Sequence, residues 1–313
     1  MVHFSTRIWY TFQLLHTFNR VTSSEWHADL DFGFAKDRVK GSFRYYDKRS
    51  EDVLNLYDNS KVKKTTTSET ILDFGQRKEI RHNVAEIGNR GFELDINAAI
   101  IKQRAFDLNV YANAAYNVNQ VLRIDADEQY SPGIGGGITA NVNAPGQAVS
   151  SLYGYRLNSD GSFRDLTGEG KISPADREVL GNPVPKTFGS LGASLRIINF
   201  NVDLRFDGAS GFKILDMNSM LADQATEVTE KYVSDGDYIR LANLGVSYKL
   251  PFSKGGLKGI TLRLSAHNLF TASKYKGWNP DVNSFGINNL TQGADYGSYP
   301  VTRTFVFGVQ FNF

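Results

Sequence analysis

The sequence contains no cysteine, no long apolar run and no marked excess of charge. The absence of cysteine from all 313 residues excludes a disulfide framework, a thiolate metal site and a cysteine nucleophile. Nowhere do about 18 consecutive apolar residues occur, which excludes a transmembrane helix. The formal net charge of +2 gives no reason to expect a nucleic-acid partner. The five histidines form no H-E-x-x-H motif and no G-x-S-x-G motif occurs, so we expect no enzyme activity.

The final stretch of the chain, 303–313, alternates between apolar and polar side chains. Apolar residues at every second position place one set on each face of a β-strand. A strand of a soluble sandwich can alternate in the same way. An amphipathic strand that ends the chain on an aromatic residue is typical of the closing strand of an outer-membrane β-barrel. We therefore interpret the alternating apolar residues as an assembly signal for the barrel assembly machinery. They are Phe305, Phe307, Val309, Phe311 and Phe313.

The same alternation recurs in segments spread along the chain. A slip in the pattern near Asn243 predicts an irregularity in one of these segments. The expected strands, about ten in number, include 26–34, 39–45, 92–100, 106–114, 186–197, 200–208, 238–250, 260–265 and 303–313.

The connections between these strands alternate between short turns and long loops. Long loops are predicted at 47–86, 120–185, 209–237 and 272–302. Soluble sandwiches do not segregate their connections in this way, whereas outer-membrane barrels have short periplasmic turns and long extracellular loops. Counted back from Phe313, the pattern predicts a periplasmic C-terminus and places every long loop outside the cell.

The two faces of the expected strands differ in polarity. A charged side chain that faces lipid at mid-bilayer costs roughly 2–4 kcal/mol, so the charged face should line a wet lumen or meet a plug. We therefore predict an all-β fold, an antiparallel transmembrane β-barrel in contact with outer-membrane lipid. The charged residues of the polar face are Asp29, Asp31, Asp95, Asp107, Asp203, Arg205, Lys249 and Arg263.

Residues 1–24 do not fit this pattern. Their mildly apolar run is interrupted by Arg7, Gln13, His16 and Arg20, and no A-x-A cleavage site follows, so the segment does not qualify as a signal peptide. We expect 1–24 to be a truncated strand or misassigned coding sequence. The barrel part is expected to span 25–313 and to be a fragment of a larger barrel.

Several short runs occur in a characteristic order and spacing. They are 89–94 (NRGFEL), 153–155 (YGY), 180–186 (LGNPVPK), 238–241 (YIRL), 268–271 (NLFT), 274–277 (KYKG), 279–281 (NPD) and 299–300 (YP), followed by the terminal strand. Together they resemble the C-terminal half of the SusC/RagA family of TonB-dependent outer-membrane transporters. The resemblance covers about 26–313 and does not extend into the residues before it.

The resemblance implies a plugged barrel of about 22 strands, of which this chain supplies about the last ten. It implies import of a large nutrient, an oligosaccharide or a peptide, together with a SusD-like surface lipoprotein. Energy would come from the TonB complex through an N-terminal part that this sequence lacks. Two alternatives stay open: a passive porin-like outer-membrane channel and a soluble carbohydrate-binding β-sandwich.

The stretch 165–176 imitates the Ca²⁺-binding loop of an EF-hand. It has oxygen-bearing side chains at positions 1, 3, 5, 9 and 12, with Gly170 at position 6 and an apolar residue at position 8. Thr and Asp at positions 3 and 12 depart from the strong ligand pattern, so a turn that only makes the long loop rigid is the alternative. The candidate Ca²⁺ ligands are Asp165, Thr167, Glu169, Lys171 through its carbonyl, Ser173 and Asp176.

Aromatic residues in the predicted external loops are candidates for stacking on a substrate. The alternatives are a place in an aromatic girdle at the membrane interface or packing within the loops. The predicted substrate-binding residues are Tyr153, Tyr155, Tyr275 and Trp278.

Overall fold

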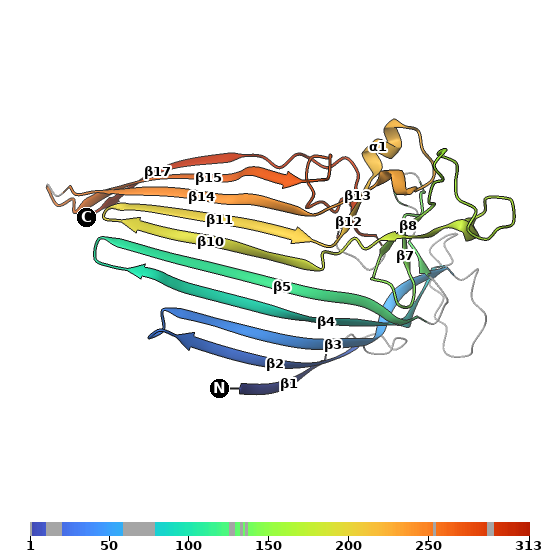
Figure 1. Cartoon of the computed structure of the whole chain (residues 1–313), viewed down its shortest axis with the longest axis horizontal. Coiled ribbons are helices and arrows are strands. Elements are labelled where there is room, and N and C mark those ends of the chain that lie inside the picture. The colour runs from blue at the N-terminus through green and yellow to red at the C-terminus, as the bar shows by residue number, and fades with distance from the viewer. Residues whose placement is uncertain are drawn as a thin grey trace.

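The computed structural model describes residues 2–10, 21–58, 79–124, 129–131, 134, 137–252, 255–286 and 291–313. Side chains are described for all of these except 2–10, 54–58, 79–84 and 129–130. Nearly every regular element in this part of the chain is a β-strand (Figure 1). The helical elements described are α1 (Met217–Ala222) and the 3₁₀ turns η2 (Pro174–Asp176) and η3 (Glu230–Tyr232). None of the described helices is long and apolar enough to cross a membrane.

One ten-stranded antiparallel sheet dominates the fold, in the order β1-β2-β3-β4-β5-β10-β11-β14-β15-β17. Among the described residues, the two outer strands, β1 and β17, each pair on one side only, so the described sheet is open. The predicted all-β barrel wall of about ten strands is confirmed. The strands are β1 (Val2–Tyr10), β2 (Thr22–Phe34), β3 (Val39–Asp58), β4 (Glu79–Lys102), β5 (Phe106–Ile124), β10 (Thr187–Ile197), β11 (Phe200–Ser210), β14 (Tyr238–Leu250), β15 (Gly259–Ser273) and β17 (Thr304–Asn312).

Short turns and long connections lie at opposite ends of the sheet. In Figure 1 the turns β2–β3, β4–β5 and β10–β11 and the C-terminus lie at one end, and α1 and the small sheets lie at the other. The turn after β2 is tight because Ala35, Lys36 and Asp37 all adopt left-handed backbone angles. The strand β1 falls within the segment 1–24, whose residues 1 and 11–20 lie outside the described part.

The predicted loop boundaries need correction. The strands β3 and β4 extend to Asp58 and from Glu79, so the loop predicted at 47–86 is too wide, and β5 continues to Ile124, beyond the predicted loop start at 120. The loops predicted at 209–237 and 272–302 differ by one or two residues from the gaps between β11 and β14 and between β15 and β17. About halfway along β3 and β4 the cross-strand neighbours become polar, as at the pair Asp47 and Arg90. Where both faces of a strand are wet, the apolar alternation stops although the pairing continues.

The two faces of the sheet have the predicted characters. On the apolar face, the Phe92 ring stacks on Phe43 and on Tyr116 across three neighbouring strands, at centroid distances of 6.2 and 5.3 Å. On the polar face, charged residues pair across strands. The Arg44 Nε donates to Asp29 Oδ1 at 2.6 Å, and Arg196 pairs with Asp107.

Glycines within the strands make room for aromatic rings on the neighbouring strand. The Phe32 ring lies over Gly41, and the Tyr111 ring lies over Gly192, so a Cβ atom at either glycine would collide with the ring. Larger residues at these two positions would push the covering ring away from the sheet.

The irregularity predicted near Asn243 is confirmed. The pairing of β14 with β15 shifts between Leu241 and Asn243, where β14 contributes one residue fewer than β15. On β15, Asn268 adopts a φ of 54°, a left-handed conformation that asparagine tolerates better than most residues. Its Nδ2 donates to the carbonyl of Thr302 at 3.3 Å, which ties the bulge to the segment before β17.

The largest buried core lies outside the main sheet. We call the described residues of 129–186, 211–237 and 274–303 the loop assembly. It contains one small sheet of β6 (Gln129–Tyr130), β7 (Asn141–Asn143), β8 (Ser151–Gly154) and β9 (Glu178–Gly181). A second contains β13 (Val233–Asp235), β12 (Lys213–Asp216) and β16 (Ala294–Asp295). The core of the loop assembly includes Leu152, Leu215, Met217 and Met220, which are all fully buried. These connections are therefore packed structure rather than solvated loops.

Candidate functional site

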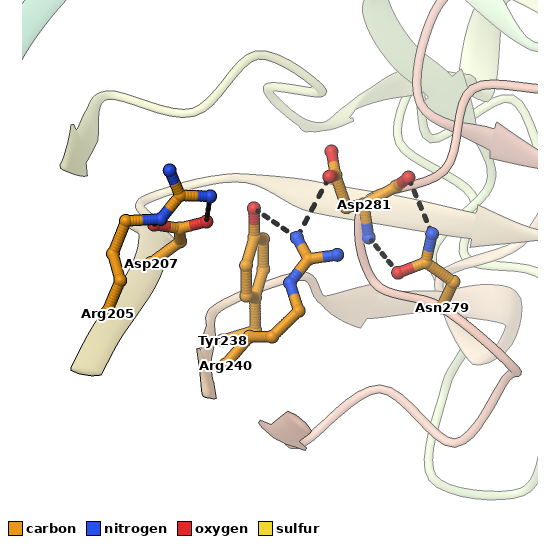
Figure 2. A network of polar contacts seen from close by, with 6 residues as sticks. All are labelled: Arg205, Asp207, Tyr238, Arg240, Asn279 and Asp281. Atoms are coloured by element: carbon orange, nitrogen blue, oxygen red, sulfur yellow. Dashed lines mark hydrogen bonds and ion pairs between the residues drawn. The ribbon is translucent and has the colours of Figure 1, made fainter. Parts of the chain in front are cut away.

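The loop assembly is fastened to the sheet by an ion pair between Arg240 of β14 and Asp281. The Arg240 Nη2 donates to Asp281 Oδ2 at 3.0 Å and to the Tyr238 hydroxyl at 3.2 Å, and its guanidinium lies 5.0 Å from the centroid of the Tyr238 ring (Figure 2). Asn279 shapes the turn that presents Asp281, because its side-chain amide bonds both the N–H and the carbonyl of Asp281. The runs 238–241 and 279–281 therefore meet in space.

The charges around this junction balance. Arg240 lies directly across from Asp207 on the polar face, and Asp207 also pairs with Arg205 at 3.2 Å (Figure 2). Two cations thus stand beside two anions, Asp207 and Asp281. The Arg240 side chain is 12% exposed, whereas that of Asp281 is 60% exposed, so the carboxylate rather than the guanidinium faces solvent. The exposed Asp281 carboxylate therefore offers hydrogen-bond acceptors to a polar solute.

The EF-hand-like loop is organised around its own carboxylates. Asp176 Oδ1 accepts hydrogen bonds from the N–H groups of Leu166 and Thr167 at 3.0 and 2.9 Å, and Oδ2 accepts from the Ser173 N–H at 2.7 Å. These donors, with the Thr167 N–H as the largest contribution, hold the pKa of the Asp176 carboxyl far below its ordinary value. Asp165 accepts from the N–H groups of two glycines, Gly168 and Gly170.

This arrangement does not fit a Ca²⁺ ion well. Amide N–H groups directed at the carboxylates of Asp165 and Asp176 occupy acceptor positions that a cation would need. Glu169 and Lys171 are exposed, and Ser173 caps η2 with its side chain. In the described part of the chain, no three His, Asp or Glu side chains are grouped to hold a metal ion. The geometry favours the alternative of a turn that makes the loop rigid, and Ca²⁺ binding stays a prediction.

Three of the four predicted substrate-binding aromatics pack within the loop assembly. Tyr153 and Tyr155 are both buried. The Tyr155 ring stacks on Phe163 at 4.8 Å, carries the Arg177 guanidinium 5.0 Å from its centroid, and donates its hydroxyl to the Ser173 carbonyl at 3.2 Å. Tyr155 therefore anchors the EF-hand-like loop rather than presenting a free face to a substrate.

Tyr275 and Trp278 are only three positions apart but differ in exposure. Tyr275 is buried and donates its hydroxyl to Asp295 Oδ2 at 2.7 Å; burial, then this hydrogen bond, raises the pKa of its hydroxyl well above the ordinary value. Trp278 is 70% exposed, so we keep the stacking proposal for it alone among the four. The structure adds two exposed aromatics in the same connection, Tyr296 and Tyr299, the latter 92% exposed. The sequence signalled Tyr299 only through the run 299–300.

The apolar residues of the terminal strand share one exposed face. Phe305, Phe307, Val309, Phe311 and Phe313 are all exposed. Within the described part of the chain β17 pairs with β15 alone, where Phe307 lies opposite Leu264. This is the geometry expected of a lipid-facing edge. Recognition of these residues by the barrel assembly machinery stays a prediction.

Comparison with known proteins decides the family. A family model described as TonB dependent receptor-like, beta-barrel, matches residues 18–269. The chain belongs to this family. The chain is 29% identical to "TonB-dependent receptor P3" of Formosa agariphila, over 93% of this chain and 34% of that protein. It is 24% identical to "TonB-dependent receptor SusC" of Bacteroides thetaiotaomicron, over 93% of this chain and 32% of that protein. The chain thus spans about a third of the length of these curated relatives, and its resemblance to SusC/RagA transporters is confirmed.

Solved structures support the same fold. The "RagAB peptide transporter" aligns with 98% of this chain and 38% of its own matched chain, at a TM-score of 0.72 and 15% identity. The "RagAB peptide importer in the 'open-open' state" aligns with a TM-score of 0.70. At this identity the likeness shows the fold alone.

Proposed function

We propose that this chain is the C-terminal part of an outer-membrane barrel that imports a large nutrient, an oligosaccharide or a peptide, with energy from TonB. The observation that carries the proposal is the ten-stranded sheet with one exposed apolar face and all packed connections at one end. The match of residues 18–269 to the family barrel supports it. In this account the apolar face contacts lipid and the polar face lines the lumen.

Aromatic residues on the apolar face support a membrane position. Toward the loop assembly, Trp26 packs on Tyr45 and Phe92 on Tyr116; toward the short turns, Phe200 packs on Tyr248. The eight-residue step from Trp26 to Phe34 on β2 spans about 26 Å at about 3.3 Å per residue. Outer-membrane barrels have aromatic girdles on either side of an apolar band of about 25 Å.

The open edges support assembly into a larger barrel. In hydrocarbon, each unpaired N–H or C=O group of an edge costs several kcal/mol, and both β1 and β17 have one unpaired edge. We infer that further strands close the sheet. An open sheet does not enclose a pore, so the ten described strands by themselves would not support transport.

The loop assembly is our proposed docking surface for the SusD-like lipoprotein, at the extracellular end. Its buried core and its ion pair to β14 support a fixed surface rather than a set of mobile loops. The C-terminus, at the opposite end in Figure 1, would be periplasmic. Exposed Trp278 and the charge-balanced junction at Arg240 would contact the substrate.

Uptake measurements with and without TonB test this proposal. Cells that depend on the complete transporter should take up labelled oligosaccharide or peptide only when TonB works. Trp278→Ala should lower uptake while leaving the amount of folded barrel unchanged, and Tyr296→Phe serves as a control that keeps its ring. This chain expressed alone with an added signal peptide should not support uptake. Uptake that persists without TonB would favour the passive channel and contradict the proposal.

A further inference from the structure

A buried carboxylate in the loop assembly has one oxygen without a partner. Asp295 on β16 is 0% exposed. Its Oδ2 accepts the Tyr275 hydroxyl at 2.7 Å, while Oδ1 receives no hydrogen bond from the described residues. An unpaired buried carboxylate oxygen is costly, because its lost hydration is not replaced. We therefore expect a cation or a hydrogen-bond donor at this oxygen.

A second carboxylate lies directly beside it. Asp216 of β12 is the parallel cross-strand partner of Asp295, so the two residues stand on neighbouring strands about 4.8 Å apart. The Asp216 side chain accepts the N–H and hydroxyl of Ser219. No ion pair joins either carboxylate to a Lys, Arg or His in the described part of the chain. Like charges at paired positions destabilise a sheet unless a cation stands between them.

The surroundings supply a further oxygen and an apolar cluster around Tyr275. Ile214, two residues before Asp216 and so on the same face of β12, packs in a buried cluster with Tyr275 and Val282. Asn283 follows Val282, and its neighbour Ser284 donates its N–H to the carbonyl of Ala294, next to Asp295. The Asn283 Oδ1 is also buried and accepts no hydrogen bond from the described residues. Two unpartnered acceptor oxygens therefore lie on neighbouring segments.

We propose that Asp295 and Asp216, with Asn283, hold a divalent oxygen-preferring cation of the Ca²⁺ type. Carboxylate and amide oxygens are the ligands that such cations prefer, and a charge of +2 offsets the two carboxylates. The cation joins β12, β16 and the segment around 283, which carries Asp281 and hence the ion pair to Arg240. The site differs from the EF-hand-like loop because Asp295 keeps one oxygen without a donor, whereas both oxygens of Asp165 and of Asp176 accept backbone N–H groups.

Terbium luminescence tests the site, since Tb³⁺ replaces Ca²⁺ and is excited through a nearby tyrosine. The complete protein, extracted in detergent, should show tyrosine-sensitised Tb³⁺ emission that Ca²⁺ competes away. Asp295→Asn keeps an acceptor for the Tyr275 hydroxyl but removes the charge, and should weaken Tb³⁺ binding by about tenfold or more. Tyr275→Phe should keep Tb³⁺ binding, measured by direct excitation, and lose most of the sensitised emission.

Asp165→Asn in the EF-hand-like loop is the matched control and should leave the emission unchanged. Heat-modifiable migration on gels checks that each variant forms a folded barrel. No Ca²⁺-sensitive emission from the unmodified protein would overturn the proposal, and so would full emission from a folded Asp295→Asn variant. If only Asp165→Asn lost the emission, the Tb³⁺ site would lie in the EF-hand-like loop, and the proposal would be overturned as well.

Discussion

Arg240 and Asp281 form an ion pair of 3.0 Å across 41 positions of sequence, joining the strand β14 to the connection that leads to β17. Both residues lie in short runs, 238–241 and 279–281, that the sequence alone shows only as part of a family resemblance. The structure gives these runs a physical role. Arg240, nearly buried on the polar face, fixes the start of a long connection over one end of the sheet.

Breaking this ion pair should loosen the connection without unfolding the sheet. Asp281→Asn removes a charge from a half-exposed pair, and we expect a loss of about 1 kcal/mol in the local opening free energy. Where cleavage follows the opening equilibrium, that loss corresponds to about fivefold faster proteolysis within 274–303 on intact cells. The double variant Arg240→Gln with Asp281→Asn should lose little more local opening free energy than either single variant. Lys40→Gln, in an exposed pair at the opposite end, is the control; equal cleavage of all variants would contradict the fastening role.

The two faces of β17 should tolerate charge differently. Phe307 is 68% exposed on the apolar face, whereas Gln310 lies on the polar face opposite Thr261. Near mid-bilayer, Phe307→Lys should lower the stability of the assembled barrel by about 2–4 kcal/mol, while Gln310→Lys should have little effect. The fraction of folded, heat-modifiable barrel in outer membranes measures the effect of each substitution. Similar yields of the two variants in the complete protein would argue against a lipid-facing Phe307.

The loop 165–176 should depend on Asp176 and not on Ca²⁺. Because its hydrogen bonds lower the pKa of Asp176, the stabilisation is fully present above the ordinary pKa and is lost only as pH falls through the lower folded-state value. The loop should therefore resist proteases at about pH 4 as well as at neutral pH. Asp176→Asn should speed cleavage within 161–178 at both pH values, with or without EDTA. Calcium-dependent protection that disappears in Asp165→Ala would instead establish a Ca²⁺ site here.

The strands and their faces were predictable because period-two alternation is a local signal. It holds where the two faces of a strand differ in polarity, and it located even the slip near Asn243. It fails where both faces of a strand carry polar residues, as at Asp47 and Arg90, and the predicted loop 47–86 was too wide for that reason.

Exposure within the connections was not predictable in the same way. Whether a tyrosine in a long loop stacks on a substrate or packs inside depends on contacts made far along the chain. Tyr155 meets Arg177, and Tyr275 meets Asp295. No local pattern distinguishes these buried tyrosines from exposed Trp278. The same holds for the Arg240–Asp281 pair, which only the folded chain brings together.

The orientation of the sheet in the outer membrane is the claim on which the whole account depends, and single-cysteine labelling measures it directly. The sequence has no cysteine, so each introduced thiol is the only one in this chain. Lys171→Cys places one in the loop assembly and Arg104→Cys places one in a short turn, both at exposed positions. A membrane-impermeant maleimide should label Lys171→Cys on intact cells, and Arg104→Cys only after the outer membrane is opened. Labelling of Arg104→Cys but not Lys171→Cys on intact cells would contradict the account.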